Sequence, residues 1–172
     1  MTTATPRPAA LPHALLAPSP SVRTARPDEA AALAALSLPF VRSGALRERP
    51  VSLYAGHAAD FLVLEAPDGT LEGCVGMRAY PEGGEGGGPA GVVYNFCVAE
   101  HQQGSGAGAG LLRAVLAMAR AQSLDALFTA TTGGGGLFLR YGFTPTTARL
   151  APRAWAESLD PRRNARVLVR TW

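Results

Sequence analysis

The chain has 172 residues, of which 47% are hydrophobic and 17% are charged, and these proportions are typical of a globular protein with one packed core. Arginine or glycine interrupts the longest apolar runs well before the roughly 20 residues that a membrane span requires. All sixteen cationic side chains are arginine, which excludes a Schiff-base lysine and the lysine of a phosphate-binding P-loop.

The net charge of +3 conceals a basic C-terminal end. Residues 140–172 contain seven arginines against Glu157 and Asp160, a combination suited to holding an anion. We expect no nucleic-acid partner, because the arginines are not interleaved with stacking aromatic residues and no helix-turn-helix or finger pattern is present.

Residues 1–20 contain five prolines and no sustained apolar stretch, so they make a poor signal peptide and predict a flexible tail before a folded domain over residues 21–172.

Cys74 and Cys97 belong to no CxxC pair and to no metal-ligand spacing. We expect both to be reduced and buried, in a cytoplasmic protein without a bound metal.

The first part of the chain predicts a short strand and two helical stretches. Residues 21–26 are strand-like, and Pro27-Asp28-Glu29 opens an alanine-rich helix, with proline in the first turn and acids at the positive end of the helix dipole. This helix is expected to end near Leu38-Pro39. Residues 51–59 form a second amphipathic stretch.

The middle of the chain predicts a β-meander. Residues 60–65 and 71–80 have the composition of strands, and Asp68-Gly69 marks the turn between them. A glycine-rich segment, residues 83–89, is expected to be a flexible connection to a strand over residues 91–99.

The last part of the chain alternates helices with strands. A helix with Leu112, Val115 and Leu116 on one face follows the glycines of residues 104–110. The remaining elements are a strand over 127–131, a short helix over 137–141, and a final pair of strands that begins at Phe143 and includes 166–169. The whole pattern predicts an α+β fold with a mixed sheet.

The segment from Val98 to Gly108 carries the most chemical information. Its glycines, Gly104, Gly106 and Gly108, lie between a strand and a helix, where the backbone can approach a ligand closely and the first helical N–H groups can hold a pyrophosphate. The loose pattern G-x-G-x-x-A also suits a dinucleotide-binding module, although the loop comes late in the chain. A helix start without a ligand is the third interpretation.

This segment resembles the acetyl-CoA loop of the GNAT acetyltransferases, Q/R-x-x-G-x-G/A. Residues 138–143, Phe-Leu-Arg-Tyr-Gly-Phe, resemble the closing F/Y-x-x-x-G-F element of that superfamily. The resemblance implies a single domain with a central, mostly antiparallel, twisted sheet flanked by helices. It also implies that acetyl-CoA is bound by Phe96, Cys97, Val98, Gln103, Gly104, Ser105, Gly106, Ala107, Gly108 and Phe138.

Within the superfamily, the chain resembles the short bacterial N-acetylglutamate synthases over roughly residues 22–170. The matching segments, which keep the family's order, are Pro39–Arg49, Asp60-Phe61, Gly73–Met77, Leu150–Trp155 and Arg163–Leu168. This resemblance implies transfer of acetyl to the α-amino group of L-glutamate, as in arginine biosynthesis.

Glutamate has two carboxylates, which guanidinium groups bind well through charge-assisted hydrogen bonds. The resemblance places Arg49, Arg78 and Arg163 where the family presents cations to its substrate, with Arg78 in place of a lysine. The chain departs from the family at Val92, where a glutamate is common, and at Ala165, which replaces a serine.

The general base is not identified by the sequence. Phe138 stands where many acetyltransferases have a tyrosine acid, and a water chain ending on Tyr94, Asn95 or Glu100 is the hypothesis for removing the amine proton. Direct transfer in a ternary complex is favoured over an acetyl-cysteine, because no histidine base stands beside Cys97 in the sequence.

Two alternatives remain open at this stage. The acceptor could be another small amine, such as glutamine, an aminoacyl metabolite, an antibiotic or an arsenical. A non-catalytic module that senses CoA or a nucleotide would bind acetyl-CoA without releasing a thiol. A homodimer is a possible assembly in either case.

Overall fold

The computed structural model describes residues 20–172, and the predicted N-terminal tail, apart from its last residue, lies outside them. Within these described residues, the core of the fold is a seven-stranded sheet in the order β1-β2-β3-β4-β5-β7-β6, in which only the β4–β5 pair is parallel. The predicted α+β class with a mostly antiparallel sheet is therefore confirmed. The strands are β1 Ser21–Thr24, β2 Phe61–Glu65, β3 Leu71–Tyr80, β4 Ala90–Val98, β5 Ala126–Thr131, β6 Thr144–Thr146 and β7 Arg166–Thr171.

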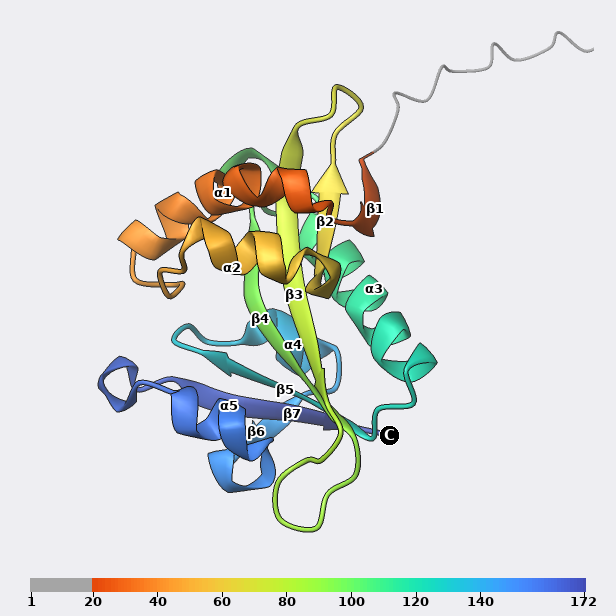
Figure 1. Ribbon diagram of the computed structural model, residues 1–172, viewed down its shortest axis with the longest axis vertical. Helices are drawn as coiled ribbons and strands as arrows, with labels where there is room; N and C mark the ends of the chain where they lie inside the picture. Colours follow the sequence, from red (N-terminus) through yellow and green to blue (C-terminus); the bar gives the residue numbers. More distant parts are fainter. Residues whose placement is uncertain (1–19) are drawn as a thin grey trace, which may run out of the picture.

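Helices cover both faces of this sheet (Figure 1). On one face lie α1 and α2, on the other lies α3, and the shorter α4 and α5 flank the β5–β7–β6 end. The helices are α1 Ala30–Arg42, α2 Val51–Gly56, α3 Ala107–Ala121, α4 Gly136–Arg140 and α5 Arg153–Ser158.

The sequence misplaced one helix end and missed one helix. Helix α1 continues through Pro39 to Arg42, beyond the predicted end near Leu38-Pro39. Proline so close to the C-terminus removes only one backbone hydrogen bond, and the Ser43 N–H still donates to the Pro39 carbonyl at 3.1 Å. Helix α5 was not predicted, because its six residues are too few to show a clear apolar period.

The glycine-rich connection after β3 is a hydrogen-bonded loop. The Gly83 N–H donates to the Gly88 carbonyl at 2.8 Å, and the Gly84 N–H donates to the Leu150 carbonyl at 3.0 Å. The loop therefore ties the β3–β4 hairpin to the segment that precedes α5, where the sequence predicted only a flexible connection.

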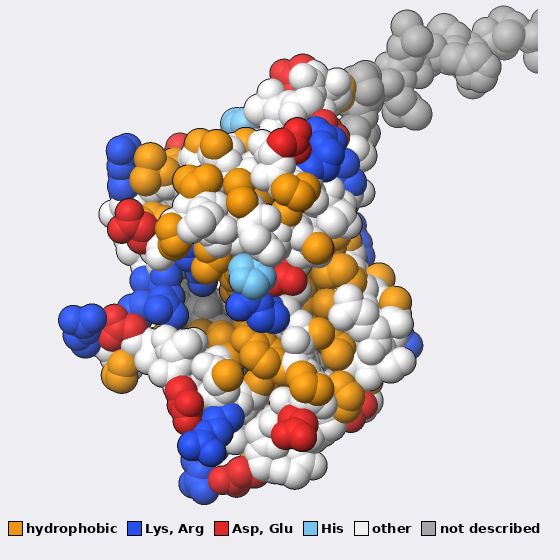
Figure 2. All heavy atoms as spheres, in the orientation of Figure 1, with side chains coloured by type: hydrophobic (Ala, Val, Ile, Leu, Met, Phe, Trp, Pro, Cys, Tyr) orange, Lys and Arg blue, Asp and Glu red, His pale blue; other side chains and the backbone are white. Residues whose placement is uncertain are grey.

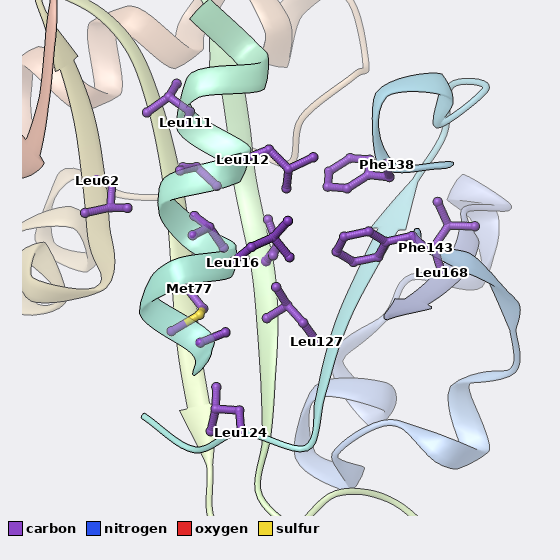
Figure 3. Close-up of a cluster of buried hydrophobic side chains, with 14 of the residues drawn as sticks. Leu62, Met77, Leu111, Leu112, Leu116, Leu124, Leu127, Phe138, Phe143 and Leu168 are labelled. Atoms are coloured by element: carbon purple, nitrogen blue, oxygen red, sulfur yellow. The ribbon is translucent and has the colours of Figure 1, made fainter. Parts of the chain in front are cut away.

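The main core lies between α3 and the sheet (Figure 3). The apolar face predicted for this helix is confirmed, since Leu111, Leu112 and Val115 are completely buried. Burial of each such side chain stabilises the fold by roughly 1.5 to 3 kcal/mol. This packing fixes α3, and hence its N-terminal end, against β2, β3 and β4.

The sheet opens between its two central strands. The β4–β5 ladder runs from Ala90↔Ala126 to Val93↔Thr129 and ends there. In the part of the chain that the structure describes, residues 94–98 of β4 have no partner in β5. Figure 1 shows the two strands diverging beyond this point.

A β-bulge in β4 lies at the start of this opening. Cys74 pairs with Cys97 and Gly76 pairs with Tyr94, so two residues of β4, Asn95 and Phe96, stand opposite one residue of β3. Asn95 has a left-handed backbone with φ of 49°, a conformation that asparagine tolerates better than most residues.

The bulge interrupts the alternation of side chains along the strand. Val93 and Phe96 both pack in the cluster on the α3 face, although a regular strand would place them on opposite faces. Tyr94 packs on the α1 and α2 face, and the side chain of Asn95 bonds there to Ser37 and Tyr54. Two adjacent polar side chains therefore point to the same face.

Glu29, the residue before α1, is held by hydrogen bonds that depend on the charge of its carboxylate. Glu29 accepts hydrogen bonds from Arg23 at 2.5 Å and from the Arg26 N–H at 2.8 Å, and Arg23 also bonds Glu65. The hydrogen bond from Arg23, partly opposed by burial, lowers the pKa of Glu29 from 4.5 to about 2. The ionised Glu29 carboxylate therefore stabilises the folded state fully above about pH 4.5, and this stabilisation is lost as the pH falls toward about 2.

We expect Glu29→Gln to lower the free energy of unfolding by roughly 1 to 2 kcal/mol at pH 7. The difference from the wild type should shrink at pH 2.5, as measured by urea denaturation at several pH values. An equal difference at pH 7 and pH 2.5 would show that the carboxylate charge is not what stabilises this corner.

Candidate functional site

The loop before α3 has the conformation of an anion cradle. Gly104 and Gly106 adopt left-handed backbones with φ of 80° and 90°, and a Cβ atom on either would meet no other atom within 4 Å. Glycine is thus required there by backbone conformation, while the space above remains open. Gly106 is the N-cap of α3, so the first N–H groups and the positive end of the dipole of a 15-residue helix face this space.

The other residues of the predicted loop mainly shape it. The side-chain amide of Gln103 donates to the Val98 carbonyl at 3.1 Å, and the hydroxyl of Ser105 donates to the Gln102 carbonyl at 2.5 Å. Ala107 and Gly108 form the first turn of α3, and a Cβ atom on Gly108 would lie 3.3 Å from Leu137.

A buried carboxylate that sequence reasoning missed holds the loop from below. Glu72 in β3 is 8% exposed. Its oxygens lie 3.0 Å from Nε2 of His101 and 2.8 Å from Nε2 of Gln102, and its carbonyl accepts from the Ala99 N–H. The sequence gives one signal for such a partner, namely the run of four polar residues at positions 100–103, between the strand and the glycines.

The opening between β4 and β5 continues from this loop toward the centre of the sheet. Phe96 and Val98 face α3 here, and Phe138 contacts Phe96 edge-on at a ring distance of 5.7 Å. Cys97 faces the opposite side, where its sulfur lies 3.6 Å from that of Cys74. Both cysteines are free and buried, as predicted. Phe138, predicted to bind the cofactor, is mostly buried beside the opening.

A pocket of about 380 Å³ lies next to the bulge, on the face that carries α1, α2 and α5. The loop between α1 and α2 forms one wall, the segment from Ala148 to Ala165 forms another, and Val93, Tyr94 and Asn95 form the floor. Figure 2 shows blue arginine side chains gathered around a hollow between these layers.

Three arginines line this pocket, namely Arg47, Arg49 and Arg163. Within residues 20–172, none of them forms an ion pair with a carboxylate. Arg47 donates to the Ser158 carbonyl at 3.0 Å, and Arg163 donates to the carbonyls of Gly44 and Ala45 at 3.2 Å. These bonds join the two walls, and all of their acceptors are neutral carbonyl oxygens.

Arg49 is the most enclosed of the three. Its guanidinium donates to Oδ1 of Asn95 at 3.1 Å and to the Arg47 carbonyl at 3.2 Å, and it lies 5.3 Å from the centre of the Tyr94 ring. Burial lowers the pKa of Arg49, but an arginine keeps its charge in proteins. A cation with only neutral partners favours an anionic ligand.

Arg78 has a different environment from Arg49 and Arg163. It does not line the pocket, and its Nε donates to Asp60 at 3.1 Å. The Tyr94 hydroxyl donates to the same carboxylate oxygen at 2.9 Å, and the Tyr94 ring crosses over Gly76, where a Cβ atom would lie only 2.7 Å from it. Asp60 thus already neutralises Arg78, and the two together fix the Tyr94 ring.

The three candidates for removing the amine proton differ in position. Tyr94 and Asn95 line the pocket, whereas Glu100 does not. Burial, together with the neighbouring Asp60 carboxylate, raises the pKa of Tyr94, so its hydroxyl stays protonated at neutral pH. The Asn95 amide has no basic atom and serves as a hydrogen-bonding group.

Residues 20–172 contain neither a cluster of metal-ligating side chains nor a helix that could span a membrane. No group of three or more His, Cys, Asp and Glu side chains in this range is arranged to hold a metal ion. None of the helices in the described part of the chain combines the length and apolar character needed to cross a bilayer.

The fold and the loop agree with a known family of enzymes. Residues 57–145, just over half of the chain, match the acetyltransferase (GNAT) domain. The chain therefore belongs to the GNAT family of acetyltransferases, as its sequence motifs predicted.

Within that family, the chain is similar to amino-acid acetyltransferases. A curated amino-acid acetyltransferase of Ralstonia nicotianae is 32% identical over 149 residues, which are 87% of this chain and 32% of that protein. The N-acetylglutamate synthase of Neisseria gonorrhoeae, solved with coenzyme A and N-acetyl-glutamate, is 27% identical and superposes with a TM-score of 0.80 over 90% of this chain and 35% of that one. The chain thus spans about a third of the length of these two relatives.

A shorter protein has the same fold. Rv2747 of Mycobacterium tuberculosis, solved in complex with CoA, superposes with a TM-score of 0.71 at 20% identity, over 89% of this chain and 99% of that one. At this level of identity the likeness establishes the architecture alone.

The loop supplies a prediction about acetyl-CoA binding. In Gly106→Val, a branched side chain would force a left-handed backbone at a cost of roughly 1 to 2 kcal/mol and would stand above the first N–H groups of α3. We expect the Kd for acetyl-CoA, measured by calorimetry, to rise by at least about tenfold.

Gly86→Val is the matched control, because Gly86 also has a positive φ and open space at its Cβ position but lies in the β3–β4 loop. It should lose similar stability and keep its affinity for acetyl-CoA. Equal affinities for acetyl-CoA in the two variants would contradict the assignment of this loop.

Proposed function

We propose that this chain transfers the acetyl group of acetyl-CoA to the α-amino group of L-glutamate, by direct transfer in a ternary complex. The observation that carries the proposal is the pocket whose three positive charges, on Arg47, Arg49 and Arg163, form no ion pair with a carboxylate within residues 20–172. An acceptor with two carboxylates would compensate them.

Arg49 and Arg163 are the proposed carboxylate ligands, because both line the pocket and, in the described part of the chain, hydrogen-bond only to neutral oxygens. Charge-assisted bonds to a carboxylate are roughly twice as strong as bonds to neutral acceptors, so substrate oxygens would compete well for these donors. Arg78, the third cation that the family resemblance assigned to the substrate, would act indirectly by holding Tyr94 beneath Arg49.

Residues on the α3 side of the opening are proposed to hold acetyl-CoA. The glycine loop and the first turn of α3 suit its pyrophosphate, and the unpaired edge of β4 over residues 94–98 suits the amide groups of its pantetheine arm. Acetyl-CoA supplies a thioester carbonyl that a neutral amine can attack. The open space above Gly104 and Gly106 and the end of the β4–β5 ladder are the structural features that fit this ligand.

The pocket favours loss of the amine proton through its charge. The α-amino group of a free amino acid is largely protonated near neutral pH, and nearby cations lower its pKa. The lining contains three arginines against Asp160, which already bonds Arg162 at 3.1 Å through each of its oxygens. We therefore propose that the arginine field, with water as the proton acceptor, takes the place of a dedicated base.

The positions of the cysteines support direct transfer. Contact with Cys97 and burial raise the pKa of Cys74 well above its usual value, and Cys97 packs against Cys74 on the face opposite to Phe96 and Val98. Neither sulfur is presented to the α3 side, where the cofactor is proposed to lie.

The similarity to an N-acetylglutamate synthase and to an amino-acid acetyltransferase agrees with an amino-acid acceptor. If glutamate is the acceptor, the product is N-acetylglutamate, the acetylated intermediate of arginine biosynthesis. Thiol release across a panel of amino acids, aminoacyl compounds and antibiotics separates this proposal from other acceptors. A protein that binds acetyl-CoA but releases thiol with no amine would instead be a sensing module.

Substitution of the pocket arginines tests whether the acceptor is glutamate or another amine. Removing Arg49 or Arg163 should cost a charge-assisted interaction of about 1.5 to 3 kcal/mol, or about 10- to 150-fold in kcat/KM for glutamate. The KM for acetyl-CoA should barely change, and glutamine should lose less than glutamate in the variant that has lost the side-chain contact.

Arg153→Ala is the matched control, because this arginine is exposed, pairs with Glu157 and does not line the pocket. Arg78→Ala should cause a smaller loss than Arg49→Ala. If Arg49→Ala and Arg163→Ala behave like Arg153→Ala, the glutamate proposal fails and the assignment to the GNAT family stands.

A further inference from the structure

Asn95 is one of the few buried polar side chains in the described part of the chain, with 3% exposure. Its Oδ1 accepts from Arg49 at 3.1 Å and from the Tyr54 hydroxyl at 3.2 Å, and its Nδ2 donates to the Ser37 hydroxyl at 2.9 Å. The side chain thus joins α1, α2 and the loop before α2 to the bulge of β4.

Ser37 fixes which way the amide of Asn95 faces. Ser37 is 1% exposed, and its hydroxyl donates its hydrogen to the Leu33 carbonyl at 2.8 Å, so this hydroxyl can only accept from Asn95. The NH₂ group of Asn95 must therefore face Ser37, and the oxygen must face Arg49, which has donors and no acceptor. Every polar atom in this chain of contacts has a matching partner.

The neutrality of this amide has a consequence for Arg49. A carboxylate at the same place would form an ion pair with the guanidinium and cancel its charge, whereas the amide oxygen orients it and leaves the charge in place. We infer that the Ser37–Asn95–Tyr54 chain aims Arg49 at a carboxylate of the acceptor, and that the uncharged amide at position 95 sets the preference for an anionic acceptor over a neutral one. Asn95 is in this view a positioning residue, and the inference rests on the proposed function.

Asn95→Asp is the direct test, because it keeps the shape of the side chain, tolerates the left-handed backbone and introduces the charge that would cancel Arg49. We expect the KM for glutamate to rise about 10- to 150-fold. The KM for glutamine should rise much less, so the preference for glutamate should collapse. The KM for acetyl-CoA and the Tm serve as internal controls, since a merely structural defect would move both.

Ser37→Ala and Tyr54→Phe give a graded version of the same test, and they keep Asn95 in place if Asn95→Asp does not fold. Each removes one neutral hydrogen bond, so each should raise the KM for glutamate by about 2- to 13-fold and leave kcat nearly unchanged. A loss in kcat alone, or no change in either variant, would overturn the positioning role.

The outcomes separate this inference from the function on which it rests. A wild-type enzyme that prefers glutamate, with an Asn95→Asp variant that keeps that preference, would overturn the inference and leave the function intact. A wild-type enzyme that does not prefer glutamate overturns the proposed function. Arg49→Ala and Asn95→Asp are then compared on the amino acid that the enzyme does use, and unequal changes in its KM would overturn the inference as well.

Discussion

The structure depends on one interruption of regular pairing in β4. This strand keeps its ladder with β3 as far as Val98, but its ladder with β5 ends at Val93, and the bulge at Asn95 and Phe96 lies at that point. Among residues 20–172, the break leaves one edge of β4 without a strand partner, and the bulge turns two consecutive side chains to one face. The proposed sites for acetyl-CoA and for the acceptor therefore meet at the same few residues, on opposite sides of the sheet.

The energetic consequence is clearest at Arg49. Enclosing a cation costs free energy unless it gains good partners, and this guanidinium has a carbonyl, an amide oxygen and an aromatic face, all of them neutral. Ser37 and Tyr54 orient the Asn95 amide, and Asp60 orients the Tyr94 ring. An anionic ligand is proposed to supply the remaining compensation. In the same region Arg78 is paired with Asp60, so two arginines that both lie against the Tyr94 ring have different partners.

Local sequence patterns predicted most of the elements, because the alternation of apolar residues and the glycine and proline positions act over a few residues. The glycine loop before α3 was predictable for the same reason, since its chemistry lies within six consecutive residues. The resemblance to N-acetylglutamate synthases pointed to Arg49 and Arg163, which the fold brings into one pocket from two different walls.

What the sequence could not show depends on contacts between distant segments. The bulge at Asn95 is a mismatch in register between β3 and β4, and neither strand reveals it alone. Glu72 beneath the loop, the wall contact of Arg47 with Ser158, and the pairing of Arg78 with Asp60 each join residues 18 or more positions apart. Helix α5 is too short for periodicity to identify.

Where the β4–β5 ladder ends, the backbone groups on one side of β4 have no partner in β5, although β4 lies in the middle of the sheet. Exposed strand edges invite pairing with other chains, and proteins commonly blunt or cover them. Here the unpaired residues 94–98 lie in the middle of seven strands, with β5 diverging on one side and with Phe96 and Val98 packed under α3 and α4. A second strand would have to enter between β4 and β5 to pair with this edge, whereas the extended pantetheine arm of acetyl-CoA, with its amide groups, is proposed to lie along it. Backbone groups that would invite aggregation at an exposed edge are thus proposed to serve ligand binding here.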